Sequence, residues 1–163
     1  MARTIAELLA VGSGPLGVTD WINIDQARVN AFADTTHHTH WLHTDPARAE
    51  KESPYQGTVA HGFLVLSLIN HAIDQCGLRP TDSAYALNYG VDRVRFLKPM
   101  PVGAGFQIRD QITLLDAEMR EKGLFTRTQH SFEIKGDDTP SVVAEYLSVW
   151  VPTQSDGVTQ PDQ

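Results

Sequence analysis

The sequence predicts one α+β domain, in which a long central helix is wrapped by an antiparallel β-sheet. Residues 59–76, VAHGFLVLSLINHAIDQC, form an apolar run that is too long for a normal strand and apolar on nearly all sides, which favours a buried helix. The C-terminal half instead contains segments of ten or more residues that alternate with period two and are rich in β-branched residues. A chain of 163 residues suffices for one domain with a substantial core.

The N-terminal part is expected to be turn-rich, with a short strand near residues 17–21, because several glycines and Pro15 precede it. Asp25 is placed to cap a helix that continues through Ala33. Asp45 and Pro46 are typical of the cap and first position of another short helix, which ends near residue 51.

Gly77 follows the apolar run directly and is placed to end the central helix. Four long strands are then predicted, with a break at KPMP between the first two; their ranges are 84–96, 105–116, 124–135 and 141–151. Residues 1–152 thus form the domain and residues 153–163 a polar tail. A single sheet around one helix leaves a second face and an open edge, so a homodimer is expected.

Charge and composition exclude several classes of function. A net charge of -7 and a pI near 5.4 argue against nucleic-acid binding, which needs a basic surface. Cys76 is the single cysteine, which excludes an intrachain disulfide and fits a reducing compartment. The longest apolar stretch, residues 63–73, is too short to cross a membrane. The start of the chain, with Glu7 inside its apolar part, is unlike a secretory signal, so the cytoplasm is expected.

Histidines are concentrated just before the apolar run. Four of the seven histidines fall within residues 37–43, and His61 follows where a glycine joins the run. Imidazole is the side chain that exchanges protons near neutral pH without a perturbed pKa, and neutral imidazole is also a common metal ligand. The cluster therefore indicates acid–base chemistry or a metal site.

Three ordered blocks of sequence resemble one known family. The first is GPLGVTDWINIDQARVNAFADTT; the second holds the patterns W-x-H-x-D-P-x-x-A and A-H-G-[FY]-L-x-L-S-L between Trp41 and Leu68; the third is NYGVDRVRFLKPMPVG at residues 88–103. Together they resemble the MaoC-like, (R)-specific enoyl-CoA hydratase family, which has the hot-dog fold. The resemblance implies reversible hydration of a trans-2-enoyl thioester of CoA or a carrier protein, as in fatty acid metabolism. It implies no metal and no cofactor, since CoA belongs to the substrate.

The family's catalytic pair is an aspartate and a histidine five residues apart, commonly within T-G-D-x-x-x-x-H. Aligned on Thr36 without gaps, His43 keeps the histidine position, while His38 occupies the aspartate position and His37 that of the glycine. The resemblance also assigns stabilisation of the thioester oxygen to the start of the central helix, where Gly62 offers an N–H at a positive helix end. Residues expected to line the substrate pocket are Trp41, His61, Asn70, Asn88, Tyr89 and Gly90.

The missing carboxylate leaves alternatives open. A His–His pair supports acid–base chemistry only if one ring stays neutral, since two charged rings repel each other. The protein would otherwise run a related reaction, or bind an acyl thioester or another apolar ligand without turning it over. A histidine-cluster metal protein is a further alternative, because His37, His40 and His43 are spaced to share one face of a helical turn.

Overall fold

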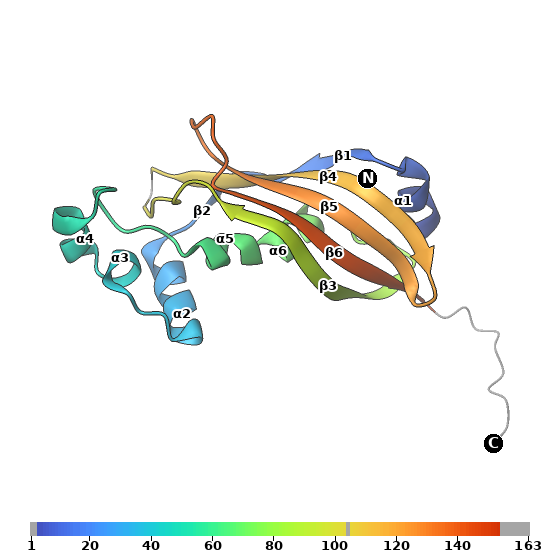
Figure 1. Ribbon diagram of the computed structural model, residues 1–163, viewed down its shortest axis with the longest axis horizontal. Helices are drawn as coiled ribbons and strands as arrows, with labels where there is room; N and C mark the ends of the chain where they lie inside the picture. Colours follow the sequence, from blue (N-terminus) through green and yellow to red (C-terminus); the bar gives the residue numbers. More distant parts are fainter. Residues whose placement is uncertain (1–2, 104, 154–163) are drawn as a thin grey trace, which may run out of the picture.

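The computed structural model describes residues 3–103 and 105–153, and in these ranges an antiparallel sheet runs in the order β1-β4-β5-β6-β3, with β2 also paired to β4 (Figure 1). The four long strands predicted from the sequence are confirmed. The strand predicted at residues 105–116 is β4, and it continues four residues beyond its predicted end. The strands are β1 (Gly14–Val18), β2 (Ile22–Asn23), β3 (Ser83–Phe96), β4 (Gln107–Arg120), β5 (Gly123–Ile134) and β6 (Val142–Pro152).

The helices lie in different places around the sheet. Along one face of the curved sheet lie α5 (Gly62–Ser67) and α6 (Ile69–Gln75), and at one end of it gather α2 (Gln26–Thr36), α3 (Trp41–Thr44) and α4 (Pro46–Glu52) (Figure 1). Helix α1 (Ile5–Val11) precedes the first strand. This arrangement is the hot-dog fold that the sequence predicts.

The predicted single central helix is in fact two helices separated at Leu68. The Ser67 hydroxyl donates to the carbonyl oxygen of Leu64 at 2.7 Å, which occupies the acceptor that an α-helix would offer to Leu68. The Leu68 N–H bonds instead to Val65 O at 3.1 Å, a tighter turn that ends α5. A local side-chain hydrogen bond therefore divides a segment whose apolar content favours one continuous helix.

The expectation that this segment is buried on all sides is also wrong for the single chain. Leu64, Val65 and Ile69 are buried against the sheet. Phe63 on the opposite side is 66% exposed, and Asn70 is exposed as well. The apolar character of this outer side therefore exceeds what the packing within one chain requires.

The main core lies between the sheet and α5–α6, and a smaller apolar cluster of Phe125, Leu147 and Val149 lies apart from it. One polar pair is fully enclosed in the core region: Asp110 Oδ2 accepts a hydrogen bond from His130 Nδ1 at 2.5 Å, and both side chains are at most 1% exposed. Such a pair is tolerated in a dry interior because each partner satisfies the other.

The N-terminal segment differs from the predicted turn-rich start, since it forms α1. Thr4 and Glu7 cap this helix reciprocally, each side chain bonding the backbone N–H of the other residue. The predicted caps Asp25 and Asp45 are confirmed, because their carboxylates accept from the backbone N–H groups of Arg28 and Arg48. Of the predicted tail, residues 154–163 lie outside the described part of the chain. Among the described residues, no helix is long and apolar enough to span a bilayer.

Candidate active site

The backbone at the end of α2 sets the direction of the histidine segment. His37 is the C-cap of α2 and has φ 55° and ψ 26°, the left-handed conformation that favours glycine. A histidine in this conformation costs about 1–2 kcal/mol. Glycine, the residue of the family pattern at this position, adopts this conformation without that cost.

His43 is held by a backbone carbonyl on another segment. It lies in the short helix α3, whose N-cap His40 accepts from Leu42 N through its own ring. His43 Nδ1 lies 2.7 Å from Val59 O. A carbonyl oxygen only accepts, so Nδ1 carries the proton and Nε2 is left with a free lone pair when the ring is neutral. The acceptor is a backbone atom, and the sequence contained no signal for it.

Three imidazoles meet at this point. The rings of His38 and His43 are 5.4 Å apart between centroids, so the structure does bring the predicted pair together. His61, the N-cap of α5, stacks on His43 at 3.8 Å with a tilt of 26°. His61 Nε2 lies 3.0 Å from the His38 carbonyl oxygen, to which it donates. His61 is thus part of the cluster as well as a buried residue at the helix start.

The environment of His43 favours the neutral form of its ring. Burial lowers the pKa of His43 below its ordinary value, and the neighbouring imidazoles of His61 and His38 lower it further, although the hydrogen bond to Val59 acts in the opposite direction. A neutral ring with a free Nε2 is the state in which histidine serves as a base or a metal ligand.

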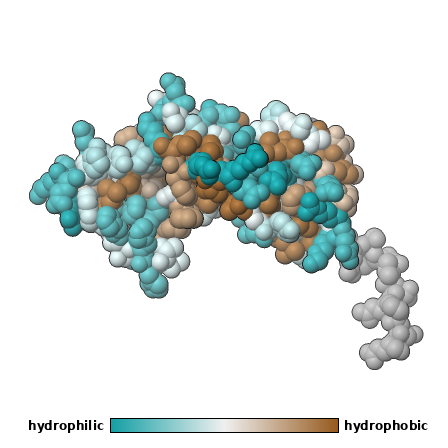
Figure 2. Space-filling view, viewed as in Figure 1, coloured by the Kyte–Doolittle hydropathy of each residue, from teal (hydrophilic) through white to brown (hydrophobic). Residues whose placement is uncertain are grey.

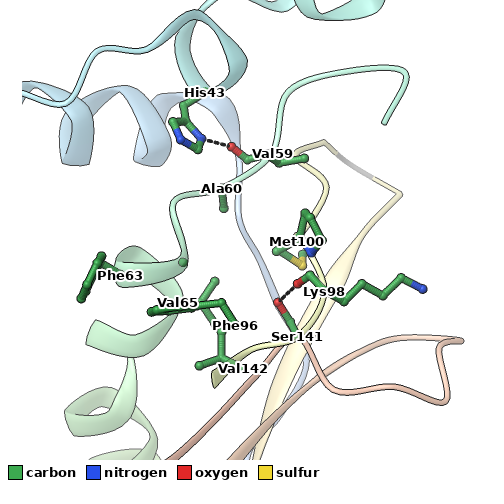
Figure 3. Close-up of a pocket in the computed structure, with 12 residues that line it drawn as sticks. His43, Val59, Ala60, Phe63, Val65, Phe96, Lys98, Met100, Ser141 and Val142 are labelled. Atoms are coloured by element: carbon green, nitrogen blue, oxygen red, sulfur yellow. Dashed lines mark hydrogen bonds between the residues drawn. The ribbon is translucent and has the colours of Figure 1, made fainter. Parts of the chain in front are cut away.

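A cavity of about 320 Å³ begins at His43 and continues between the start of α5 and the loop after β3 (Figure 3). Its walls are mostly apolar, and the Lys98 ammonium at its edge is paired with Asp137. The lining residues are His43, Val59, Ala60, Gly62, Phe63, Val65, Phe96, Lys98, Pro99, Met100, Ser141 and Val142. The cavity therefore combines an apolar chamber with one neutral imidazole, which suits an acyl chain and a reacting group.

Gly62 lies where it was predicted, as the first residue of α5 and in the wall of this cavity. A Cβ built on Gly62 would come within 2.5 Å of the Phe96 ring, so the glycine is required for packing whatever the cavity holds. Within the described residues, the Gly62 N–H has no hydrogen-bond acceptor. This N–H is consequently available to a ligand.

Four of the six residues expected to line the substrate pocket, all except Trp41 and His61, line a second cavity, of about 310 Å³, between β3 and α5–α6. The pairing of β3 with β6 shifts register between Asn88 and Gly90, which is the bulge expected there. The Tyr146 hydroxyl, whose role the sequence did not suggest, donates its hydrogen to Asn88 Oδ1 and also lies 3.3 Å from Asn70 Oδ1. The residues shared with the prediction are Asn70, Asn88, Tyr89 and Gly90.

Trp41 lines neither of these two cavities. The guanidinium of Arg48 lies 4.5 Å above its ring, so Trp41 packs within the α3–α4 region. The structure therefore places Trp41 in packing contacts with α4 and not in the wall of either cavity.

Comparison with known proteins shows which family the chain resembles in sequence. Residues 12–133 match the MaoC like domain. The chain is 36% identical over 136 residues to Nodulation protein N of Rhizobium leguminosarum, with 82% of this chain and 83% of that protein covered. It is 35% identical over 150 residues to 3-hydroxyacyl-thioester dehydratase Z of Mycobacterium tuberculosis, with 91% of this chain and 97% of that protein covered.

Among solved structures, the R-hydratase PhaJ1 from Pseudomonas aeruginosa in its unliganded form superposes with a TM-score of 0.70. That comparison covers 99% of this chain and 96% of the hydratase at 19% sequence identity. At this identity the similarity shows the fold, which agrees with the sheet and helices described above.

Proposed function

The chain belongs to the MaoC-like domain family, and we propose that it catalyses the reversible, (R)-specific hydration of trans-2-enoyl thioesters of CoA or a carrier protein. The observation that carries the proposal is the position of His43. Its neutral ring has a free Nε2 at one end of an apolar cavity, and Gly62 contributes its N–H to the wall of the same cavity. Proton transfer and oxyanion stabilisation thereby meet beside space for an acyl chain.

The proposed chemistry follows from these roles. His43 Nε2 takes a proton from a water molecule, whose oxygen attacks the β carbon of the enoyl thioester. Negative charge then develops on the thioester oxygen, which the Gly62 N–H stabilises. His38, which must start the reaction protonated, delivers its proton to the α carbon from the position of the family's aspartate, and the proton held by His43 then returns to His38. No metal or redox cofactor takes part in this scheme.

Direct measurement tests the reaction. Metal-free protein, with a chelator present, is incubated with crotonyl-CoA, and loss of the enoyl chromophore is followed together with the configuration of the 3-hydroxyacyl product. Formation of the (R) product supports the proposal. Absence of turnover combined with stabilisation of the protein by acyl-CoA would instead favour the alternative of a pocket protein that binds the thioester without hydrating it, which His38 at the aspartate position specifically favours.

Restoring the carboxylate gives a sharper test of His38. We expect His38→Asp to raise kcat by about tenfold or more, because a carboxylate at this position favours the protonated form of His43, which can then return the proton taken from water to the α carbon. His38 is exposed, so the substitution has little effect on folding. The matched control is His71→Asp on the exposed side of α6, which should leave kcat unchanged. A lower kcat in His38→Asp would show that the imidazole itself is required.

The proposed enzyme is also a homodimer assembled through β3. This strand is a long edge of the sheet, and its outward side chains Tyr85, Leu87 and Tyr89 are 53%, 44% and 64% exposed. A long edge strand with a row of exposed apolar side chains invites pairing with another chain. The exposed ring of Phe63 on α5 lies 5.3 Å, between centroids, from the ring of Phe96 on β3 and adds to the apolar surface near this edge. Figure 2 shows apolar surface gathered across the middle of one face of the molecule.

A charge on β3 should therefore weaken the dimer. We expect Leu87→Lys to raise the dimer dissociation constant by about tenfold or more, corresponding to at least ~1.4 kcal/mol. Sedimentation velocity over a concentration series measures this constant. Met119→Lys, at a residue of β4 that is 48% exposed, is the control and should not change it. A wild-type chain that sediments as a monomer at all concentrations would contradict the proposed interface.

A further inference from the structure

We propose that His38, His43 and His61 form a binding site for one divalent transition-metal ion of the Zn²⁺ class. One ring nitrogen from each of these residues lies within 4.8 Å of the corresponding nitrogens of the other two. The three side chains come from the end of α2, from α3 and from the start of α5. This site goes beyond the proposed hydration, and its existence does not depend on that reaction.

Backbone carbonyls fix the tautomers of two of the three rings. His43 donates through Nδ1 to Val59 O at 2.7 Å, and His61 donates through Nε2 to His38 O at 3.0 Å. Each ring is left with one unprotonated nitrogen. Protein metal sites commonly use this arrangement, in which the second nitrogen of a ligating histidine donates to a backbone or carboxylate oxygen.

The buried Nδ1 of His61 is the strongest indication that this cluster binds a ligand. His61 is 4% exposed, and its Nδ1 is a buried polar atom without any hydrogen-bond partner among the described residues. A buried acceptor left unpaired carries a free-energy cost. A metal ion bound by this nitrogen would remove that cost.

The geometry requires limited movement to reach coordination. Three nitrogens around a tetrahedral zinc ion are about 3.3 Å apart, given Zn–N bonds of about 2.0–2.1 Å. His38 supplies most of the movement, because it is exposed and its ring makes no hydrogen bond in the described structure. The stacked rings of His43 and His61 must also tilt further apart than their present 26°.

The donor set indicates the class of metal. Three neutral imidazoles suit Zn²⁺, Co²⁺, Ni²⁺ and Cu²⁺, whereas Mg²⁺ and Ca²⁺ prefer oxygen ligands. Three protein ligands leave a fourth position for water or a small ligand, and His43 borders the large cavity.

The trio differs from the one that sequence spacing suggests. His37, His40 and His43 share a face only if the segment is one continuous helix, but α2 ends at His37 and α3 begins after His40. The fold instead brings in His61, 18 positions after His43 in the chain. Since His43 Nε2 is both the proposed base and a proposed ligand, hydration and metal binding are measured separately.

Isothermal titration of Zn²⁺ into the metal-free full-length chain, without a histidine tag, tests the site. We expect one Zn²⁺ per chain, and Co²⁺ should give the visible absorption typical of tetrahedral coordination. His38→Ala should weaken Zn²⁺ binding by about 100-fold or more, since loss of a direct ligand exceeds the 10–100-fold effect of losing an outer-shell partner. His61→Asn should do the same; circular dichroism confirms that this variant is folded.

His71→Ala and His40→Ala serve as controls, because these histidines lie outside the trio, and both should bind Zn²⁺ like the wild type. Absence of saturable binding to the wild type would overturn the proposal. Undiminished binding by His38→Ala would overturn it too, as would a loss of binding in His40→Ala, which would assign the metal to the loop histidines. None of these readouts depends on enoyl thioester turnover.

Discussion

Replacement of His43 by alanine is expected to lower kcat for crotonyl-CoA hydration by roughly 10²–10⁴-fold, the usual contribution of a positioned general acid or base. The expected loss is large because His43 is the histidine that lines the cavity of about 320 Å³. KM should change little, since the imidazole acts on water and not on the acyl chain. Steady-state assays on metal-free protein, with a chelator present, separate the two constants.

His43→Gln separates proton transfer from positioning. A glutamine amide can still donate to Val59 O, but it cannot take up a proton at neutral pH. We therefore expect His43→Gln to be as inactive as His43→Ala while retaining wild-type stability more closely. Hydration at the wild-type rate by either variant would remove His43 from the chemistry and leave the binding alternative.

Local patterns were sufficient to predict most of the sheet. In β4 and β5 the more buried residues recur at every second position over much of the strand, which matches the period-two pattern of their sequences. The caps Asp25 and Asp45 were equally readable, because capping depends on residues three positions apart. The helix α1 was missed even though Thr4 and Glu7 are spaced as a capping box.

Features that depend on competing hydrogen bonds or on contacts between distant residues could not be predicted from the sequence. The division of the central helix at Leu68 follows from one hydroxyl, Ser67, whose bond to Leu64 O wins over the regular helical bond. The exposure of Phe63 could not be predicted, because an apolar side chain is equally compatible with a buried position and with a surface that contacts another molecule.

The site was predicted only in part, because some of its contacts join residues that are far apart in the chain. His38 and His43 are close in sequence, and their separation matches a family pattern, so their proximity was expected and is observed. His61 joins them through a bond to the His38 carbonyl across 23 positions, and the orientation of His43 comes from Val59 O. Backbone acceptors have no residue signature, so tautomers and the resulting free nitrogens appear only in three dimensions.

The second large effect concerns stability, at the buried pair of Asp110 and His130. Asp110→Ala is expected to lower the free energy of unfolding by about 3–5 kcal/mol, the usual effect of removing one partner of a buried pair. The substitution leaves His130 Nδ1–H and the Ser131 backbone N–H without their acceptor in an interior that excludes water. Urea denaturation followed by circular dichroism measures the change.

Asp92→Ala is the matched control for this substitution. Asp92 also accepts from a basic side chain, Arg127, but its own side chain is 48% exposed. Solvent screens such a pair, so its removal should cost no more than about 1 kcal/mol. Equal losses for Asp92→Ala and Asp110→Ala would contradict the importance assigned to the buried pair.

The pH dependence of stability tests the direction in which folding shifts the pKa of Asp110. Burial raises the pKa of Asp110, although the hydrogen bond from His130 acts against this shift. A raised pKa means that the folded chain holds the proton more tightly than the unfolded chain. The carboxyl therefore stabilises the fold most below its unfolded pKa of about 3.9, and this contribution falls as pH rises through the raised value.

Asp110→Asn has no such titration, so the comparison isolates the carboxyl. We expect the unfolding free energy of the wild type, relative to Asp110→Asn, to decrease as pH rises above about 4. Denaturant midpoints at a series of pH values give this difference directly. A difference that grows over the same range would mean that His130 lowers the pKa of Asp110 and that pairing, not burial, dominates this carboxyl.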